Sequence, residues 1–418
     1  MLPVSSCSRQ PTAFIDALFT ATSATCVTGL TVVETGLHWS FFGKCVILLL
    51  IQIGGLGFMS IALLFSIIAR RRITPRERIV FAQSQNISDL SGIVKFAKFI
   101  VYGTFSAEFV GALLLSFRFV PQFGPANGIF KSIFHSVSAF CNAGFDTFGT
   151  GDSMCAYAAD PFVSVVICLL VILGGLGFFV WRDLMLWRKT KKSLSPYSKI
   201  VLITSACLLA GGMLLIFAFE CENPLFDAMS RPKLLLAAFF QSVVTRTAGF
   251  YSIRLADMSS PSKAVSMILM FIGGASGSAA GGIKVGTFAV VLIAMSGILK
   301  GKNNFDVFKR RISLNNVLRA MGILSVGIAI VLACTFLLCL MEPTISFTAV
   351  LYEVVSAFAT VGQSLGITPQ LHFLSKLLIS LLMFFGRVGI ITVTFAILFR
   401  QARRENLISY PETSVLLG

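Results

Sequence analysis

Long apolar stretches alternate with short polar connections along most of this chain. Seven of the stretches are long enough to cross a membrane as a helix, at about residues 45–69, 93–117, 161–181, 199–219, 264–299, 315–341 and 374–399. Between them lie shorter amphipathic stretches, and four of these lead into a segment centred on glycine. The pattern predicts an all-α polytopic membrane protein in which half-helices and loops are inserted between the spans.

The four glycine-centred segments are degenerate copies of one pattern. They surround Gly29, Gly144, Gly249 and Gly362 and read ATCVTGL, AFCNAGF, VTRTAGF and FATVGQ. The intervals between these glycines are 115, 105 and 113 residues. Roughly 25 to 30 residues after each glycine, a second glycine cluster lies in an apolar run, at 53–58, 173–178, 272–277 and 385–390. This periodicity predicts four pseudo-symmetric repeats around a central ion path.

Each repeat is expected to contain a span, a re-entrant half-helix, a glycine loop and a second span. The repeats are expected at 1–75, 76–195, 196–305 and 306–418, and the last includes a C-terminal tail. In repeat one the half-helix, at 14–24, begins almost at the first residue, so the first outer span of that repeat is expected to be missing. The other half-helices are expected at 128–140, 233–244 and 347–358.

The composition supports a membrane location. Hydrophobic residues make up 56% of the 418 residues and charged residues 12%, with a mean hydropathy of +0.87, which excludes an ordinary soluble domain. Of the 34 Lys and Arg residues, 22 fall at 70–98, 182–199, 300–319 and 400–404, whereas acidic residues dominate the connections between these clusters. By the positive-inside rule we expect the basic clusters and the C-terminus on the cytoplasmic side of the cell membrane. Nucleic-acid binding is not expected, because the basic clusters lack interleaved aromatic residues.

The sequence lacks the usual signs of enzyme or metal chemistry. Its ten cysteines form no CxxC pair, and its three histidines have no ligand-like spacing. No catalytic triad, phosphate-binding loop or dinucleotide-binding fingerprint is present, and the glycine-rich stretch at 273–284 lacks the Gly-Lys-Ser/Thr ending of a phosphate loop. We therefore expect no covalently bound cofactor and no enzymatic activity.

A backbone ion filter explains the four glycine loops. Non-helical backbone is tolerated at membrane depth only where protein encloses it or where it faces water. Glycine adopts positive φ at little cost, so successive carbonyl oxygens can point the same way and replace the hydration shell of a cation. The half-helices would direct the negative ends of their dipoles to the same place. A single glycine would equally suit close helix packing, but four at one repeat position favour a K+ filter. The expected filter residues are Thr28, Gly29, Ala143, Gly144, Ala248, Gly249, Val361 and Gly362.

Several motifs match a known family over nearly the whole chain. They lie at 14–24, 27–30, 138–146, 245–250, 273–284 and 410–412. In these motifs the chain resembles the Trk/Ktr/HKT superfamily of potassium transporters, most closely the membrane subunit of Ktr-type bacterial uptake systems (KtrB). The resemblance implies four membrane-pore-membrane repeats, filter glycines at the positions given above, a homodimer, and a cytosolic regulatory subunit of KtrA type that binds a regulatory nucleotide. Two residues depart from the family pattern: Gln363 replaces an apolar residue and is expected to tune the outer filter, and Ala275 replaces a common serine.

A second functional element is expected in the third repeat. The stretch 273–282 is too rich in glycine and serine to continue as a straight span, so we expect a broken helix whose loop obstructs the path beneath the filter. Arg387 is expected to bind carbonyl groups of this loop and hold it across the path. Tight helix packing and a structural ion pair are the respective alternatives. The candidate gating residues are Gly273, Gly274, Ser276, Gly277, Ser278, Gly281, Gly282 and Arg387.

One further arginine lies close to the expected filter. Arg246 precedes Gly249 by three residues, and we expect it to face away from the path and pair with Glu353, or failing that with Asp16, as filter support. The leading hypothesis is a potassium-translocating membrane subunit. A sodium-selective or sodium-coupled transporter of the same architecture is the alternative. A membrane-embedded enzyme would need His, Asp or Ser clustered at one depth, and the sequence shows no such cluster.

Overall fold

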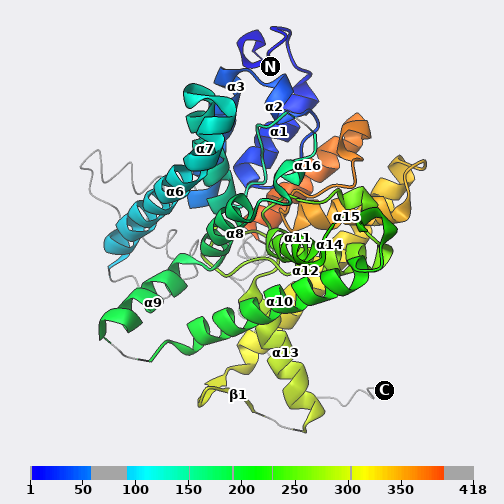
Figure 1. Ribbon diagram of the computed structural model, residues 1–418. Helices are drawn as coiled ribbons and strands as arrows, with labels where there is room; N and C mark the ends of the chain where they lie inside the picture. Colours follow the sequence, from blue (N-terminus) through cyan, green and yellow to red (C-terminus); the bar gives the residue numbers. More distant parts are fainter. Residues whose placement is uncertain are drawn as a thin grey trace.

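The computed structural model describes residues 2–57, 92–149, 151–190, 193–227, 229–301 and 304–389 (Figure 1). The fold is almost entirely helical, with one short antiparallel hairpin in which Phe305 is paired with Ile312. Its elements are η1 (Pro3–Ser5), α1 (Phe14–Cys26), α2 (Thr35–His38), α3 (Phe41–Leu56), α6 (Ile93–Phe123), α7 (Pro125–Phe140), η2 (Cys155–Tyr157), α8 (Pro161–Gly175), α9 (Phe178–Thr190), α10 (Pro196–Glu220), η3 (Pro224–Phe226), α11 (Arg231–Val244), η4 (Leu255–Asp257), α12 (Ser260–Phe271), α13 (Val285–Leu299), β1 (Phe305–Val307), β2 (Arg310–Ile312), α14 (Leu314–Met341), α15 (Phe347–Phe358), η5 (Thr368–Gln370) and α16 (Phe373–Val388).

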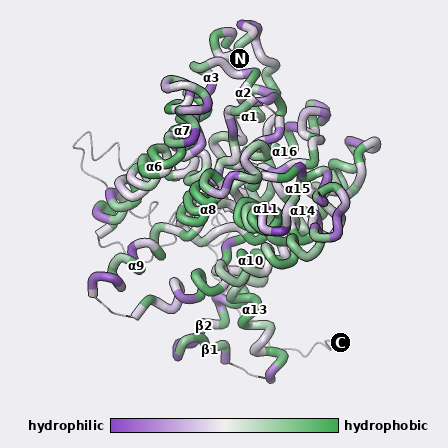
Figure 2. The backbone as a smooth tube through the Cα atoms, viewed as in Figure 1, coloured by the Kyte–Doolittle hydropathy of each residue, from purple (hydrophilic) through white to green (hydrophobic). Residues whose placement is uncertain are grey.

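Three helices among the described residues are long and apolar enough to cross a membrane as single elements. They are α6, α10 and α14, with hydropathy of 1.6, 2.5 and 2.8 over their most apolar windows. Each contains the span predicted at 93–117, 199–219 or 315–341, and each packs along the half-helix that follows it, α7, α11 or α15. Large side chains such as Phe109 and Leu340 remain exposed on these helices, at 71% and 80%, as expected of surfaces that face lipid. Figure 2 shows hydrophobic residues along α8 and the middle of α10, and hydrophilic residues at the hairpin.

The second helix of each repeat is short. Helices α3, α8, α12 and α16 contain 16, 15, 12 and 16 residues. The span predicted at 161–181 is broken, because α8 ends at Gly175 and α9 leaves it at an angle of 97°; together the two helices are apolar and long enough for one bent span. The break lies at Gly177, whose φ of +84° is a left-handed conformation that ends a helix. The stretch 264–299 is interrupted between α12 and α13, as its glycine content predicted. Parts of the predicted spans 45–69 and 374–399 lie outside the described residues.

The four half-helices α1, α7, α11 and α15 lie at the centre of the fold, as buried residues on each of them indicate. One hydrophobic core joins repeats one and two and extends to Phe240 and Phe250 of repeat three, and a second joins repeats three and four and includes Phe19 and Cys26 of α1. Helix α1 packs between α3 and α16, so the first and fourth repeats are in contact although they are far apart in sequence (Figure 1). The amino group of Lys376 on α16 lies 2.9 Å from the Asp16 carboxylate on α1. The chain therefore closes into a ring in which α16 lies against α1.

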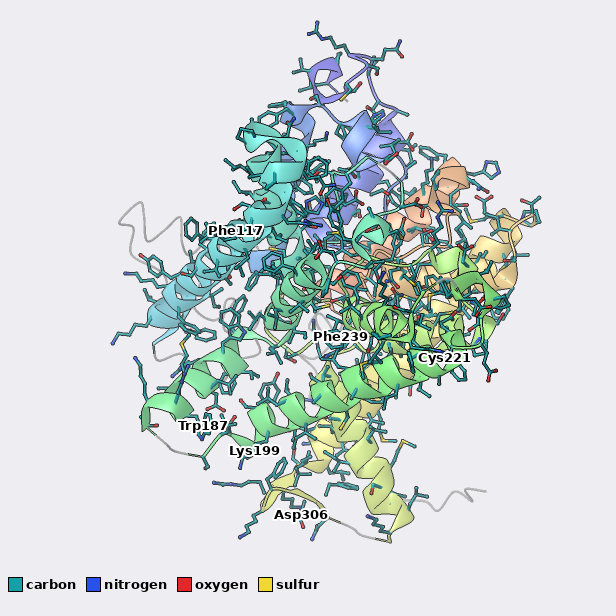
Figure 3. All side chains as sticks on the ribbon, viewed as in Figure 1. Phe117, Trp187, Lys199, Cys221, Phe239 and Asp306 are labelled. Atoms are coloured by element: carbon teal, nitrogen blue, oxygen red, sulfur yellow. The ribbon has the colours of Figure 1, made fainter. Side chains whose placement is uncertain are left out.

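Two of the predicted basic clusters lie together at one end of the molecule. Figure 3 labels Trp187 and Lys199 near the junction of α9 and α10, and Asp306 in the hairpin. The Lys199 amino group lies 5.5 Å from the ring centre of Phe308, so the junction and the hairpin are in contact. The predicted clusters at 70–98 and 400–404 lie mostly or wholly outside the described residues, as does the C-terminal tail.

Candidate ion filter and intramembrane loop

The four predicted filter glycines meet at the centre of the ring. A Cβ atom built on Gly144 would lie 2.7 Å from Cα of Gly249, and one on Gly362 would lie 2.9 Å from Cα of Gly29. A Cβ atom on Gly29 would collide with the carbonyl oxygen of Ala143, next to Gly144. Each loop therefore lies against its neighbours in chain order. Four backbone segments separated by more than 100 residues thus converge on one place.

All four glycines have positive φ, which residues with a side chain rarely adopt. The φ values of Gly29, Gly144, Gly249 and Gly362 are +95°, +69°, +77° and +94°. Both the conformation and the crowding at these positions require glycine. The neighbouring predicted filter residues are all completely buried: Thr28, Ala143, Ala248 and Val361.

A second repeated feature was missed by the sequence analysis. Two residues before each glycine, Val27, Asn142, Thr247 and Thr360 have φ of +58°, +61°, +69° and +51°. Only Asn is common in this left-handed conformation, and β-branched residues are rare there. Such residues store about 1–3 kcal/mol of strain each and persist where the surrounding structure fixes them. The sequence offers one signal for the turn, Asn142, because asparagine is the usual substitute for glycine at helix ends.

These left-handed residues end the half-helices and turn the chain into the loops. In three repeats the amide of the next residue bonds to the carbonyl five residues earlier, as in a Schellman motif. The N–H groups of Thr28, Ala143 and Val361 donate to the carbonyls of Ser23, Ser138 and Ser356 at 2.8, 2.7 and 2.8 Å. In repeat three the equivalent Ala248 instead donates to Val244, four residues earlier, at 2.9 Å. The third loop therefore leaves its half-helix differently from the other three.

Serine side chains also brace three of the loops. The Oγ atoms of Ser23 and Ser356 accept hydrogen bonds from the amides of Gly29 and Gly362, both at 3.0 Å. The equivalent Ser138 hydroxyl donates to the carbonyl oxygen of Phe145 at 2.8 Å. Repeat three has Val243 at this position, six residues before its glycine, and a valine side chain can form no such bond.

The second glycine clusters allow the short helices to approach the ends of the half-helices. A Cβ atom on Gly54, Gly174 or Gly386 would collide with the carbonyl oxygen four residues before a filter glycine, in Thr25, Phe140 or Phe358 respectively. Because the obstacle is backbone, a small side-chain movement could not relieve it. At these three positions glycine is required for packing.

The glycine-rich stretch between α12 and α13 forms a closed loop beside the filter. The amide of Gly273 donates to Ile283 at 2.9 Å, and the amide of Val285 donates to Gly274 at 3.0 Å. A Cβ atom on Gly282 would lie 3.2 Å from Cβ of Ala359, at the end of half-helix α15. The loop therefore lies against the C-terminal ends of half-helices α11 and α15, next to the turns that precede Gly249 and Gly362.

The same loop is bound to the break between α8 and α9. The amides of Ala275 and Ala279 donate to Gly175 and Gly174 at 2.9 and 3.2 Å, and the amide of Phe178 donates to Gly277 at 3.0 Å. The carbonyls that α8 leaves unpaired at its end are thus used by the loop. Within the loop, the Ser278 hydroxyl donates to the carbonyl of Ala275 at 2.6 Å. The carbonyl oxygen of Ser276, the other serine named as a gating residue, would lie 2.8 Å from a Cβ atom built on Gly177.

Arg387 connects the loop to repeat one. Its guanidinium donates to the carbonyl oxygen of Ala279 in the loop and to that of Gly54 near the end of α3. The contact with a loop carbonyl is the type predicted for this residue, whereas the bond to Gly54 was not foreseen. Lys284 at the end of the loop donates to the carbonyl of Ala280 at 2.6 Å. Both cations therefore use backbone oxygens as partners.

Arg246 does not form the predicted pair. Its guanidinium donates to the Ser205 hydroxyl at 3.2 Å and to the carbonyl of Gly273 at 3.4 Å. Glu353 instead accepts a bond of 2.5 Å from the Thr368 hydroxyl, and Asp16 is paired with Lys376. Within the described residues Arg246 has no carboxylate partner, because it points from the end of α11 toward α10.

The side chain of Gln363, directly after Gly362, forms a buried hydrogen-bond network. Its Nε2 donates to the carbonyl oxygen of Phe250 at 2.8 Å, and its Oε1 accepts from the Tyr352 hydroxyl at 3.0 Å and from Nε2 of Gln241 at 3.1 Å. The sequence identified Gln363 as a departure from the family pattern but gave no sign of these partners, which come from repeats three and four.

Polar contacts on the outer connections hold repeats two and three together. Arg254 donates two hydrogen bonds to the Asp152 carboxylate, at 3.1 and 2.9 Å, and this anion raises the pKa of Arg254. The Tyr251 hydroxyl donates to the carbonyl of Gly151 at 2.8 Å. Within the described residues no group of three His, Cys, Asp or Glu side chains is placed to hold a metal ion.

Comparisons with known proteins agree with this architecture. The chain is 43% identical over 420 residues to the potassium/sodium uptake protein NtpJ of Enterococcus hirae, covering 100% of this chain and 92% of that protein. It is 39% identical over 419 residues to the Ktr system potassium uptake protein B of Bacillus subtilis, with the same coverage. The crystal structure of the potassium transporter TrkH from Vibrio parahaemolyticus has the same fold, with a TM-score of 0.71 over 92% of this chain and 78% of that one at 18% identity. Residues 2–407 match the TrkH family, described as cation transport protein, and the chain therefore belongs to this family.

Proposed function

We propose that this chain is the potassium-translocating membrane subunit of a Ktr/Trk-type uptake system. The ring of four glycine loops carries the proposal, because it brings backbone from all four repeats to one axis. Carbonyl oxygens in such a ring can replace the hydration shell of an alkali cation without any charged side chain. Relatives named as potassium uptake proteins, similar over the full length of this chain, support the choice of ion.

The half-helices favour a cation at the ring. The C-terminal ends of α1, α7, α11 and α15 lie within a few residues of the four glycines. Each end carries about half a negative charge from its unpaired carbonyls. The membrane potential would drive the ion inward, at about 2.3 kcal/mol per elementary charge for each 100 mV.

In this proposal the loop between α12 and α13 is the gate, and Arg387 is its latch. The loop lies against the ends of the half-helices and is bound to the break after α8, and Arg387 joins it to repeat one. These bonds come from three repeats, so breaking them together would free the loop. Displacement of the loop would then open the path below the filter.

The remaining features follow the family pattern. The protein would act as a homodimer in the cell membrane, with a cytosolic KtrA-type subunit that binds the regulatory nucleotide. The basic cluster around the α9–α10 junction and the hairpin would then face the cytoplasm, where that subunit could reach it. Na+ is the second candidate ion, because the E. hirae relative is named a potassium/sodium uptake protein.

Uptake by a bacterial strain that lacks its own potassium uptake systems tests the proposal. We expect the chain, expressed with a KtrA-type subunit, to restore growth on limiting K+ and to accumulate K+ in preference to Na+. Expression of the chain alone should give weaker or unregulated uptake. Uptake of Na+ but not K+ would favour the second candidate, and uptake of neither ion by protein that reaches the membrane would contradict the proposal.

A further inference from the structure

Gln363 is the only residue directly after a filter glycine that is polar. The equivalent residues in the other repeats are Leu30, Phe145 and Phe250, and all four positions are buried. A buried amide is unfavourable unless its donors and acceptor are paired. The side chain of Gln363 is paired at both ends, as described above. A polar side chain at this point is therefore part of a built network.

The geometry fixes which way the Gln363 amide points. The carbonyl oxygen of Phe250 can only accept a hydrogen bond, so it must face Nε2. The opposite end then presents Oε1 to two donors, the Tyr352 hydroxyl and Nε2 of Gln241. Reversing the amide would place two oxygens against each other at Phe250. The network therefore has one orientation, in which the Gln363 amide donates to Phe250 and accepts from Gln241 and Tyr352.

The bond to Phe250 replaces a brace that repeat three lacks. In repeat two the carbonyl directly after the filter glycine, that of Phe145, accepts a hydrogen bond from Ser138. Repeat three has Val243 at the serine position, and its equivalent carbonyl, that of Phe250, accepts from Gln363 instead. Both carbonyls are thus engaged by a side chain at the same place in the loop. One brace comes from within the repeat and the other comes from the next repeat.

Such a brace controls where the neighbouring carbonyl oxygens lie. A carbonyl held by a side chain is unavailable to an ion, and it anchors the adjacent glycine, whose own carbonyl is the expected ligand. The bond also fixes the separation of loops three and four, because Gln363 follows Gly362 directly and Phe250 follows Gly249 directly. Discrimination between K+ and Na+ depends on how far the ligands can close around the smaller ion, or on their field strength.

We propose that Gln363 is a selectivity-determining positioning residue that holds the third and fourth filter loops at a fixed separation. This inference rests on the proposed function. It assigns no contact between Gln363 and the ion, because the amide acts through the carbonyl of Phe250. Tyr352 and Gln241 hold the amide in the orientation that this bond requires.

Three substitutions separate the parts of the network. Gln363→Glu keeps an oxygen acceptor but replaces the Nε2 donor to Phe250 with a second oxygen, and Gln363→Met removes donors and acceptor at similar volume. Tyr352→Phe removes one donor to Oε1 and leaves Gln363 in place. The matched control is Thr335→Val, which removes a buried hydroxyl that bonds to the carbonyl of Val331 within α14, away from the filter.

The measurement is K+ uptake with Na+ and Rb+ as competitors, together with the thermal stability of each purified protein. For Gln363→Glu and Gln363→Met we expect K+ uptake to persist while preference for K+ over Na+ falls roughly two- to tenfold, the equivalent of losing one neutral hydrogen bond. Tyr352→Phe should change the preference in the same direction by less. Thr335→Val should lower stability slightly and leave the preference unchanged.

Two other outcomes would overturn the inference in distinguishable ways. If the Gln363 and Tyr352 variants lose stability but keep the wild-type preference, the network is only structural and the inference is wrong. If the unmodified protein itself transports no K+, the proposed function fails, and the inference fails with it. Should Gln363→Met not accumulate, Tyr352→Phe decides the question, because it leaves the amide and its bond to Phe250 available.

Discussion

At the residue scale, left-handed backbone defines the centre of this protein. Two residues before each filter glycine a residue with a side chain has positive φ, and the glycine itself has positive φ again. Positive φ is unfavourable for valine and threonine, which are the residues two positions before the glycine in three of the four loops. The surrounding half-helices and serine braces must therefore supply the compensation. Four of the eight described residues that combine a side chain with positive φ lie in these loops, where the surrounding structure fixes them.

A methyl group at Gly249 should abolish transport. Alanine would have to adopt a φ of +77°, and its Cβ atom would lie 2.6 Å from the carbonyl oxygen of Val361 and 2.9 Å from Cα of Gly144. We expect no measurable K+ uptake by Gly249→Ala in the complementation assay. The control is Gly211→Ala on α10, where a Cβ atom would meet nothing within 4 Å. That change should preserve uptake and stabilise the helix by about 0.5–1 kcal/mol. Normal uptake by Gly249→Ala would contradict the filter assignment.

At the scale of elements, the fold depends on helices that stop early. Helices α3, α8 and α16 are followed by Gly57, Gly177 and Gly389, with φ of +78°, +84° and +87°, each three residues after the glycine that packs under a half-helix. The two glycines of each short helix have different functions. The first allows the helix to approach the half-helix closely, and the second ends the helix so that its last backbone carbonyls can bond to other segments. In repeat two those carbonyls bind the intramembrane loop.

Gly174→Ala tests the packing function. Its Cβ atom would collide with the carbonyl oxygen of Phe140, so α8 would have to move away from α7 and from the loop that it holds. We expect a loss of about 2–4 kcal/mol in stability, in the range of overpacked cores and broken hydrogen bonds. Thermal unfolding of the detergent-solubilised protein measures it, with Gly322→Ala on α14, an open position, as control. Equal melting temperatures for the two variants would refute this role of Gly174.

Arg387→Ala tests the latch. The change removes the bonds to Ala279 and Gly54 and leaves the loop held by repeats two and three. We expect K+ flux to rise several-fold and its dependence on the regulatory subunit to weaken, because the loop can leave the path more readily. Arg387→Lys keeps the charge but has no forked guanidinium to bind both carbonyls at once. Its K+ flux should lie between those of the wild-type protein and Arg387→Ala. Unchanged flux and unchanged regulation in the alanine variant would rule out a latch.

At the scale of the whole molecule, the ring must be closed between its first and last repeats. Helix α1 packs against α16, and the Lys376–Asp16 pair, which is only 10% and 21% exposed, joins them across 360 residues of sequence. A pair this well shielded is worth more than one at the surface. Closure brings Gly29 against Gly362, so the filter depends on it.

A double-mutant cycle at Asp16 and Lys376 tests the closure. Lys376→Met leaves the carboxylate without its cation, and we expect a loss of about 1–3 kcal/mol in stability. Asp16→Asn should cost a similar amount. The double variant should lose less than the sum, because neither charge is then left unpaired. Thermal unfolding of all four proteins measures the coupling, and additive losses would show that the two side chains do not stabilise each other.

The sequence by itself indicated the membrane class and marked the four glycine loops that meet in the structure. These depend on local properties: an uninterrupted apolar run makes α6, α10 and α14 spans, and glycine at a constant interval marks the loops. The glycine-rich stretch after α12 was recognised as a break for the same reason, because its composition cannot sustain a helix. The second cluster at 173–178 was read as part of a span, since glycine is also common within membrane helices and only its φ distinguishes the two cases.

The tertiary structure alone decided the partners of the buried polar groups. Gln363 meets Phe250 across 113 residues, and Arg246 meets Ser205 in place of the predicted Glu353. The tertiary structure also imposes positive φ on the residues two positions before the glycines, a conformation that valine and threonine side chains disfavour. Contacts of this kind depend on how the four repeats pack around the axis, and the residue types at each position allow many pairings. The sequence fixes how many loops reach the centre, and the packing of the repeats fixes which atoms meet there.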